Sequence, residues 1–86
     1  MTIMLQAIRA LENDSYEVTI SDAEGVKSFM FLYDKNRRSV RPDKSFMTYS
    51  WGRLSGRDLM ITLGRFASGE FVEFPMKLEE TSFKEF

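Results

Sequence analysis

The residue types that could carry chemistry are few in this chain, because it contains neither histidine nor cysteine. Without imidazole and thiol groups, the sequence offers no histidine general base, no cysteine nucleophile and no metal site built from those two ligands. Carboxylates, Lys, Tyr, Ser and Thr remain. We therefore expect no enzymatic activity, no cofactor and no metal site, and chemistry carried by carboxylates alone is the one exception left open.

The carboxylates come in groups, but their spacing is not that of a catalytic pair. Glu12, Asp14 and Glu17 follow the end of a predicted helix, where a solvated charge is the usual state. Glu70 and Glu73 are three positions apart on a predicted strand, so their side chains point to opposite faces. General acid–base chemistry needs two groups facing one substrate. The sequence therefore predicts no catalytic residue.

The clearest charge pattern is a basic block over residues 35–57. The net charge of the chain is only −1, yet this block holds seven basic residues against one acidic residue. Residues 1–34 hold two basic against six acidic residues, and residues 58–86 hold three against six. Five of the seven are Arg, whose planar guanidinium suits bidentate contacts with carboxylates and phosphates. The block favours an acidic partner, unless the acidic flanks of its own fold neutralise it.

Two aromatic residues, Tyr49 and Trp51, lie within this basic block. Basic residues interleaved with aromatic rings are typical of surfaces that bind single-stranded nucleic acid, because the rings stack on bases. The sequence pI near 5.4 argues against this use, since dedicated nucleic-acid-binding domains usually have a pI above about 9. Both rings could equally belong to the core. The residues of this alternative site are Arg37, Arg38, Arg41, Lys44, Tyr49, Trp51 and Arg53.

A glycine-containing turn offers a third possibility. Gly52 and Gly56 precede a predicted helix, so backbone N–H groups there could hold a phosphate with help from Arg53 and Arg57. No Lys-Ser or Lys-Thr pair follows, as a P-loop would require. A turn followed by a helix cap accounts for the same residues.

The spacing of apolar residues predicts where the helices and strands lie. Met4, Ile8 and Leu11 recur at helical spacing, which predicts a helix over 2–13. Further along, apolar and polar residues alternate, which is the period of a half-buried strand. The last of these strands should lie at a sheet edge, because Pro75 lacks an N–H donor. We predict strands over residues 16–21, 26–33, 37–41, 45–53 and 70–78.

The predicted strand 26–33 is apolar on both faces. Val26, Met30 and Leu32 share one face, and aromatic residues share the other. Since helices can cover only one face, the other needs more of the core, a curled sheet or a partner. Aromatic residues and Arg are the usual anchors of protein interfaces, so we predict the contact on the aromatic face. The predicted partner-binding residues are Phe29, Phe31, Tyr33, Arg37, Arg38 and Arg41.

Residues 55–69 carry conflicting signals. Ser55 and Asp58 have the spacing of a capping box, and an apolar stripe with Gly69 behind it favours a helix near 56–68. Ile61 and Gly64 lower helix propensity, so a strand over 59–66 is the alternative.

The composition suits one small folded domain. With 86 residues, of which 43% are apolar and 14% aromatic, the chain has room for one core and is not of the disordered class. We expect a single domain over 1–86, in which the tail 79–86 either frays or docks through Phe83 and Phe86. No stretch resembles a signal peptide or a membrane span, and cysteine is lacking, so we expect a cytoplasmic protein with no membrane partner.

These signals predict an α+β fold. Its mainly antiparallel, curled sheet should have about five strands, with an N-terminal helix and a second helix near 56–68. A nearly all-β barrel with one N-terminal helix is the alternative. The expected function is that of a small non-enzymatic regulatory or adaptor module that binds another protein, with self-association as a special case. Single-stranded nucleic-acid binding is the alternative.

Overall fold

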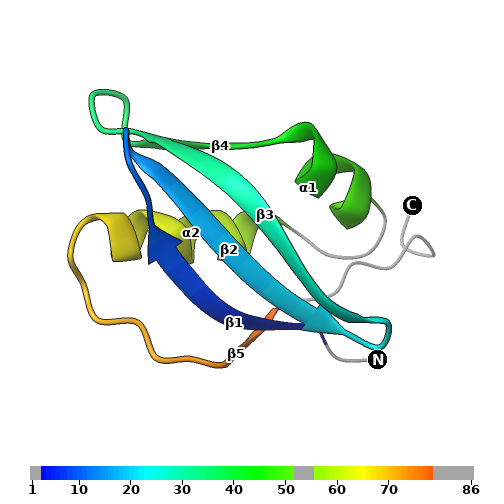
Figure 1. Cartoon of the computed structure of the whole chain (residues 1–86). Helices are drawn as coiled ribbons and strands as arrows, with labels where there is room; N and C mark the ends of the chain where they lie inside the picture. The colour runs from blue at the N-terminus through cyan, green and yellow to red at the C-terminus, as the bar shows by residue number, and fades with distance from the viewer. Residues whose placement is uncertain (1–2, 52–55, 79–86) are drawn as a thin grey trace.

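A computed structural model describes residues 3–51 and 56–78 of the chain. Figure 1 shows a curled sheet with two helices packed against it. The elements, in chain order, are β1 (Ile3–Ala10), β2 (Ser15–Asp22), β3 (Gly25–Asp34), β4 (Ser39–Pro42), α1 (Lys44–Ser50), α2 (Gly56–Ala67) and β5 (Met76–Leu78).

The described strands form one sheet in the order β4-β3-β2-β1-β5, and every neighbouring pair is antiparallel. The sheet curls into a half-barrel, and α2 lies across its concave side (Figure 1). The predicted class, a small α+β domain with a curled antiparallel sheet, is therefore confirmed. The helix predicted near 56–68 is α2, so the nearly all-β alternative is wrong.

The hairpin of β2 and β3 is the centre of the sheet and agrees with the prediction. Tyr16 is paired with Phe31 and Val18 with Phe29, and all four side chains are buried on the concave face. The turn between the strands ends at Gly25, whose φ of 128° is a conformation that favours glycine. These two strands provide the surface on which both helices pack.

The predicted helix over 2–13 is wrong, because this segment contains β1. Ile3, Leu5 and Ile8 point into the core. A register shift between Leu5 and Ala7 adds one residue to the strand, so that Gln6 and Ala7 are both exposed. Because of this bulge, the buried residues Leu5 and Ile8 are three positions apart instead of the two expected in a regular strand. The resulting spacing resembles that of a helix.

The predicted strand over 45–53 is also wrong, because α1 occupies Lys44–Ser50. Phe46 and Tyr49 are three positions apart and both are buried, as on one face of a helix. Asp43 caps the helix, since its Oδ1 accepts a hydrogen bond of 2.8 Å from the Phe46 N–H. The aromatic positions that looked alternating therefore belong to one helical turn.

Of the remaining two strands, β4 is shifted along the chain relative to the prediction and β5 is much shorter than predicted. β4 covers Ser39–Pro42 instead of 37–41, and β5 covers only Met76–Leu78 of the predicted 70–78. β5 pairs with β1 at one edge of the sheet and follows directly after Pro75, in agreement with the expected edge position.

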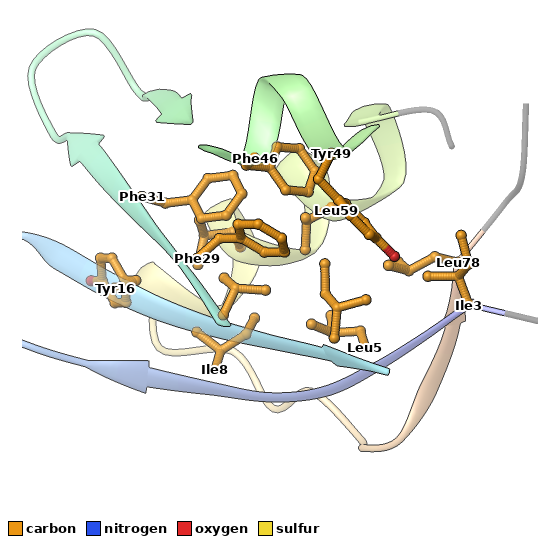
Figure 2. Close-up of a cluster of buried hydrophobic side chains, with 13 residues drawn as sticks. Ile3, Leu5, Ile8, Tyr16, Phe29, Phe31, Phe46, Tyr49, Leu59 and Leu78 are labelled. Atoms are coloured by element: carbon orange, nitrogen blue, oxygen red, sulfur yellow. The ribbon is translucent and has the colours of Figure 1, made fainter. Parts of the chain in front are cut away.

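A single cluster of buried apolar side chains fills the space between the concave face and the helices (Figure 2). α2 contributes Leu59 and Leu63, which are fully buried, and α1 contributes Phe46 and Tyr49. Gly69 lies just beyond α2 with a φ of 88°, as expected of a glycine that ends a helix. The convex face of the sheet has no described helix on it (Figure 1).

Candidate binding surfaces

The aromatic face predicted to bind a partner is part of the core. Phe29 and Phe31 are 7% and 1% exposed, and they lie beneath α1 (Figure 2). The ring of Phe46 is 5.4 Å from that of Phe29 and 4.9 Å from that of Phe31, measured between centroids. The prediction that these two phenylalanines contact a partner is therefore corrected: the helix that was expected to be a strand covers them.

The other members of the predicted site are separated from one another. Tyr33 is half-buried on the concave side. Arg37 lies in the β3–β4 turn, where its Nε is 3.9 Å from Oδ2 of Asp34. Arg38 ends the same turn and lines a groove beside α2. Arg41 pairs with Leu32 across β3 and β4 and lies on the convex side. The arginines therefore do not surround one aromatic patch.

The convex face of β3 is an apolar surface that neither described helix covers (Figure 1). Val26 is 69% exposed, Met30 41% and Leu32 50%. A shallow hollow at the end of this stripe is lined by Met30, Leu32, Arg41 and Asp43 among others. The sequence predicted two apolar faces on β3, and the face that was assigned to the partner is the buried one.

The alternative nucleic-acid site is likewise divided. Tyr49 is 9% exposed and packs on Phe29, so the prediction that it stacks on bases is wrong. Trp51 is 78% exposed at the end of α1. Arg38 lies at the opposite end of β4 from that helix (Figure 1). Arg53 and most of the glycine turn 52–56, including the possible phosphate site, are outside the described residues.

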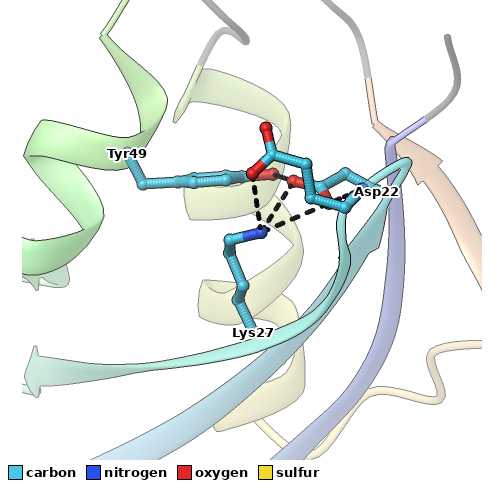
Figure 3. Close-up of polar contacts among 4 residues, drawn as sticks. Asp22, Lys27 and Tyr49 are labelled. Carbon is cyan, nitrogen blue, oxygen red and sulfur yellow. Dashed lines mark hydrogen bonds and ion pairs between the residues drawn. The ribbon is translucent and has the colours of Figure 1, made fainter.

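A polar cluster ties α1 to the β2–β3 hairpin (Figure 3). The Tyr49 hydroxyl donates a hydrogen bond of 2.6 Å to Oδ2 of Asp22, whose side chain is 4% exposed. Lys27 Nζ lies 3.4 Å from Asp22 Oδ1 and 3.7 Å from Glu24 Oε2, and it is 5.7 Å from the centre of the Tyr49 ring. Sequence reasoning missed this cluster, because Asp22 and Tyr49 are 27 positions apart.

The hydrogen bond from Tyr49 is the main reason that the pKa of Asp22 lies below its ordinary value of 3.8. Burial opposes this shift, while the Glu24 N–H and Lys27 reinforce it. Because each group in the cluster has a partner, we interpret the cluster as a structural tie between elements. Among the described residues, no three acidic side chains are placed to hold a metal ion.

The chain matches no known family model, no curated protein and no solved structure. Neither of the two described helices has the length and apolar character needed to cross a membrane.

Proposed function

We propose that the chain is a small regulatory or adaptor module that binds another protein through the convex face of β3 and β4, and that it is not an enzyme. The observation that carries this proposal is the exposure of Val26, Met30 and Leu32 along one strand. Single exposed apolar residues are common, but an aligned set on a sheet face marks an interaction surface.

The surroundings of this stripe suit a protein partner. Polar side chains around the stripe form hydrogen bonds with one another. Gln6 Nε2 on β1 donates to Ser21 Oγ on β2 at 2.7 Å, and the hydroxyls of Thr19 on β2 and Ser28 on β3 are 3.4 Å apart. Such pairs are less costly to remove from water than unpaired groups. Arg41 lies beside Leu32 and adds an anchor of the type enriched at interfaces.

The strand that carries the stripe is packed on its other face, which favours a preformed binding surface. Its strand is held from behind by Phe29 and Phe31, and their burial fixes the direction of the side chains between them. A preformed surface loses little conformational entropy on binding. A second copy of the chain could present the same stripe about a twofold axis, which is the simplest form of this proposal.

The test places a charge in the middle of the stripe. Leu32→Glu and Met30→Glu should abolish partner capture in affinity purification, or dissociate a homo-oligomer in sedimentation experiments. Thr48→Glu is the matched control, because it adds the same charge at an exposed position of α1, outside the convex face of β3 and β4. If both apolar variants keep the partners and the oligomeric state of the unaltered chain, the proposal is wrong.

A second candidate, single-stranded nucleic-acid binding, is favoured by one observation: Trp51 is 78% exposed and lies within the basic block of residues 35–57. As the sole tryptophan, it gives a specific fluorescence signal. Titration with single-stranded DNA and RNA should quench it, and affinity should fall with salt at a slope of about −0.7 per phosphate contacted. Fluorescence that is unchanged by either nucleic acid would eliminate this candidate.

A further inference from the structure

A second surface lies on the other side of β4, in a groove between the β3–β4 turn and α2. Tyr33 and Val40 line it from the sheet, and Met60, Ile61 and Gly64 line it from the helix. Tyr33 and Val40 are paired across the strands, one position away from the Leu32–Arg41 pair of the convex face. Because successive residues point to opposite faces, the groove and the convex stripe are separate surfaces.

Basic groups dominate the rim of this groove. Arg38 and Arg65 line it together with Glu70 as the one acidic lining residue. Arg65 Nε is 3.6 Å from Glu70 Oε1, and both side chains are more than half exposed, so this ion pair is weak and open to exchange. Arg38 has no hydrogen bond or ion pair with its side chain in the described part of the chain.

Arg38 has a backbone conformation that arginine rarely adopts. Its φ is 52°, a left-handed conformation in which glycine or asparagine is more stable. Asp34 fixes the turn, because its Oδ1 accepts hydrogen bonds from the N–H groups of Asn36 and Arg37 at 3.0 and 3.2 Å. Arg38 therefore combines an unusual backbone conformation with a charged side chain that has no partner among the described residues, and residues in such conformations cluster at functional sites.

We propose that this groove binds a short acidic segment of a partner protein that carries apolar side chains between its carboxylates. A carboxylate takes up the free guanidinium of Arg38, and a second one replaces Glu70 on Arg65. The apolar side chain between them packs on Val40, Met60 and Ile61, the last of which is 52% exposed. This goes beyond the convex-face proposal and uses different residues.

The test uses a fluorescein-labelled six-residue peptide that alternates Glu and Leu, followed by anisotropy and by amide NMR shifts. We expect salt-sensitive binding with the largest shifts at Val40 and Gly64. Peptides that alternate Glu with Ser, or Lys with Leu, should bind at least about tenfold more weakly, because each lacks one half of the recognition.

Arg38→Gly separates function from folding. It removes the guanidinium and relieves the left-handed backbone, so the melting temperature should stay or rise while peptide affinity falls about tenfold. Asn13→Gly is the matched control, because Asn13 has a φ of 58° in another turn and is not part of the groove. Ile61→Glu is a second variant, in which an added carboxylate repels the peptide at an exposed helix position.

The outcomes are distinct from those of the convex-face test. Leu32→Glu should leave peptide affinity unchanged, whatever it does to the larger partner. The groove proposal is overturned if the shifts lie away from Val40 and Gly64, or if both Arg38→Gly and Ile61→Glu bind the peptide as well as the unaltered chain. Preferential binding of a single-stranded oligonucleotide at the same amides would also overturn it, in favour of a phosphate ligand.

Discussion

The two faces of β3 carry side chains of similar hydrophobicity but have opposite environments. Phe29 and Phe31 on the concave face are 7% and 1% exposed, whereas Met30 and Leu32 on the convex face are 41% and 50% exposed. Both helices pack on the concave side, so topology and not hydrophobicity decides which face is core (Figure 1). The exposure of the convex apolar residues is the observation behind the proposed binding surface.

Truncation of neighbouring residues on the two faces of β3 should have very different effects on stability. Phe31→Ala should lower the unfolding free energy by about 3–5 kcal/mol, because it leaves a cavity against Phe46. Leu32→Ala should change it by no more than about 0.5 kcal/mol, since half of that side chain is already in water. Urea denaturation followed by circular dichroism measures both.

The Leu32→Ala result is also informative if it differs from this expectation. A large loss that grows with protein concentration would show that the convex face is buried in an oligomer of the chain. A large loss that does not depend on concentration would contradict the assignment of the convex face as free surface.

The next largest effect concerns the tie that holds α1 over the concave face. Tyr49→Phe keeps the ring on Phe29 but removes the hydrogen bond to Asp22. We expect a loss of unfolding free energy smaller than that of Phe31→Ala, because no cavity forms and one charge-assisted hydrogen bond is lost. Thermal denaturation near about pH 7, where Asp22 is charged, measures it.

The pH dependence identifies the hydrogen bond as the cause. The pKa of Asp22 is lowered in the folded protein, so its stabilisation is complete above the unfolded-state pKa and is lost as pH falls through the lower folded-state pKa. The difference between Tyr49→Phe and the unaltered chain should therefore shrink below the ordinary pKa of 3.8. A difference that stays constant through this range would assign the effect to packing instead.

The fold class and the central hairpin could be predicted because β2 and β3 alternate regularly. β1 could not, because Met4, Ile8 and Leu11 have helical spacing although only Ile8 of the three is buried in the core. The bulge between Leu5 and Ala7 also interrupts the alternation expected of a strand. α1 was mistaken for a strand because a helix of seven residues spans barely two turns, too short for its period to stand out. The combination of Pro42, Asp43 and an apolar residue at Phe46 was the available signal for a helix start.

The error at α1 is connected with the error in the predicted binding site. The predicted helices could cover only one face of strand 26–33, and the aromatic face was assigned to the partner because aromatic residues and Arg are the usual interface anchors. In the structure, α1 covers Phe29 and Phe31 through Phe46. Arg37, Arg38 and Arg41 are exposed, but the position of Arg41 opposite Leu32 depends on the pairing of β3 with β4, which one sequence does not reveal. The groove beside α2 and the Asp22–Tyr49 contact are long-range features of the same kind.

A smaller effect is expected from the cap that joins α1 to β3. Asp43 Oδ1 accepts from the Phe46 N–H at 2.8 Å, and its Oδ2 is 3.4 Å from the Met30 N–H. Asp43→Ala should lower the unfolding free energy by about 1 kcal/mol, the usual value for a lost N-cap. Asp43→Asn is the control and should retain most of it, because the amide oxygen can cap equally well. Equal losses in both variants would contradict the capping role.

The smallest effect on stability, and the one that sharpens the comparison most, is expected from Leu32→Glu. Its carboxylate remains in water and close to Arg41, so the unfolding free energy should change by no more than about 0.5 kcal/mol. A variant with unaltered stability but lost association would show that the convex side chain serves binding alone. Chemical denaturation and sedimentation of the same sample give both values. Unfolding of this variant, with Thr48→Glu remaining folded, would instead place Leu32 in the core and remove the contrast between the two faces of β3.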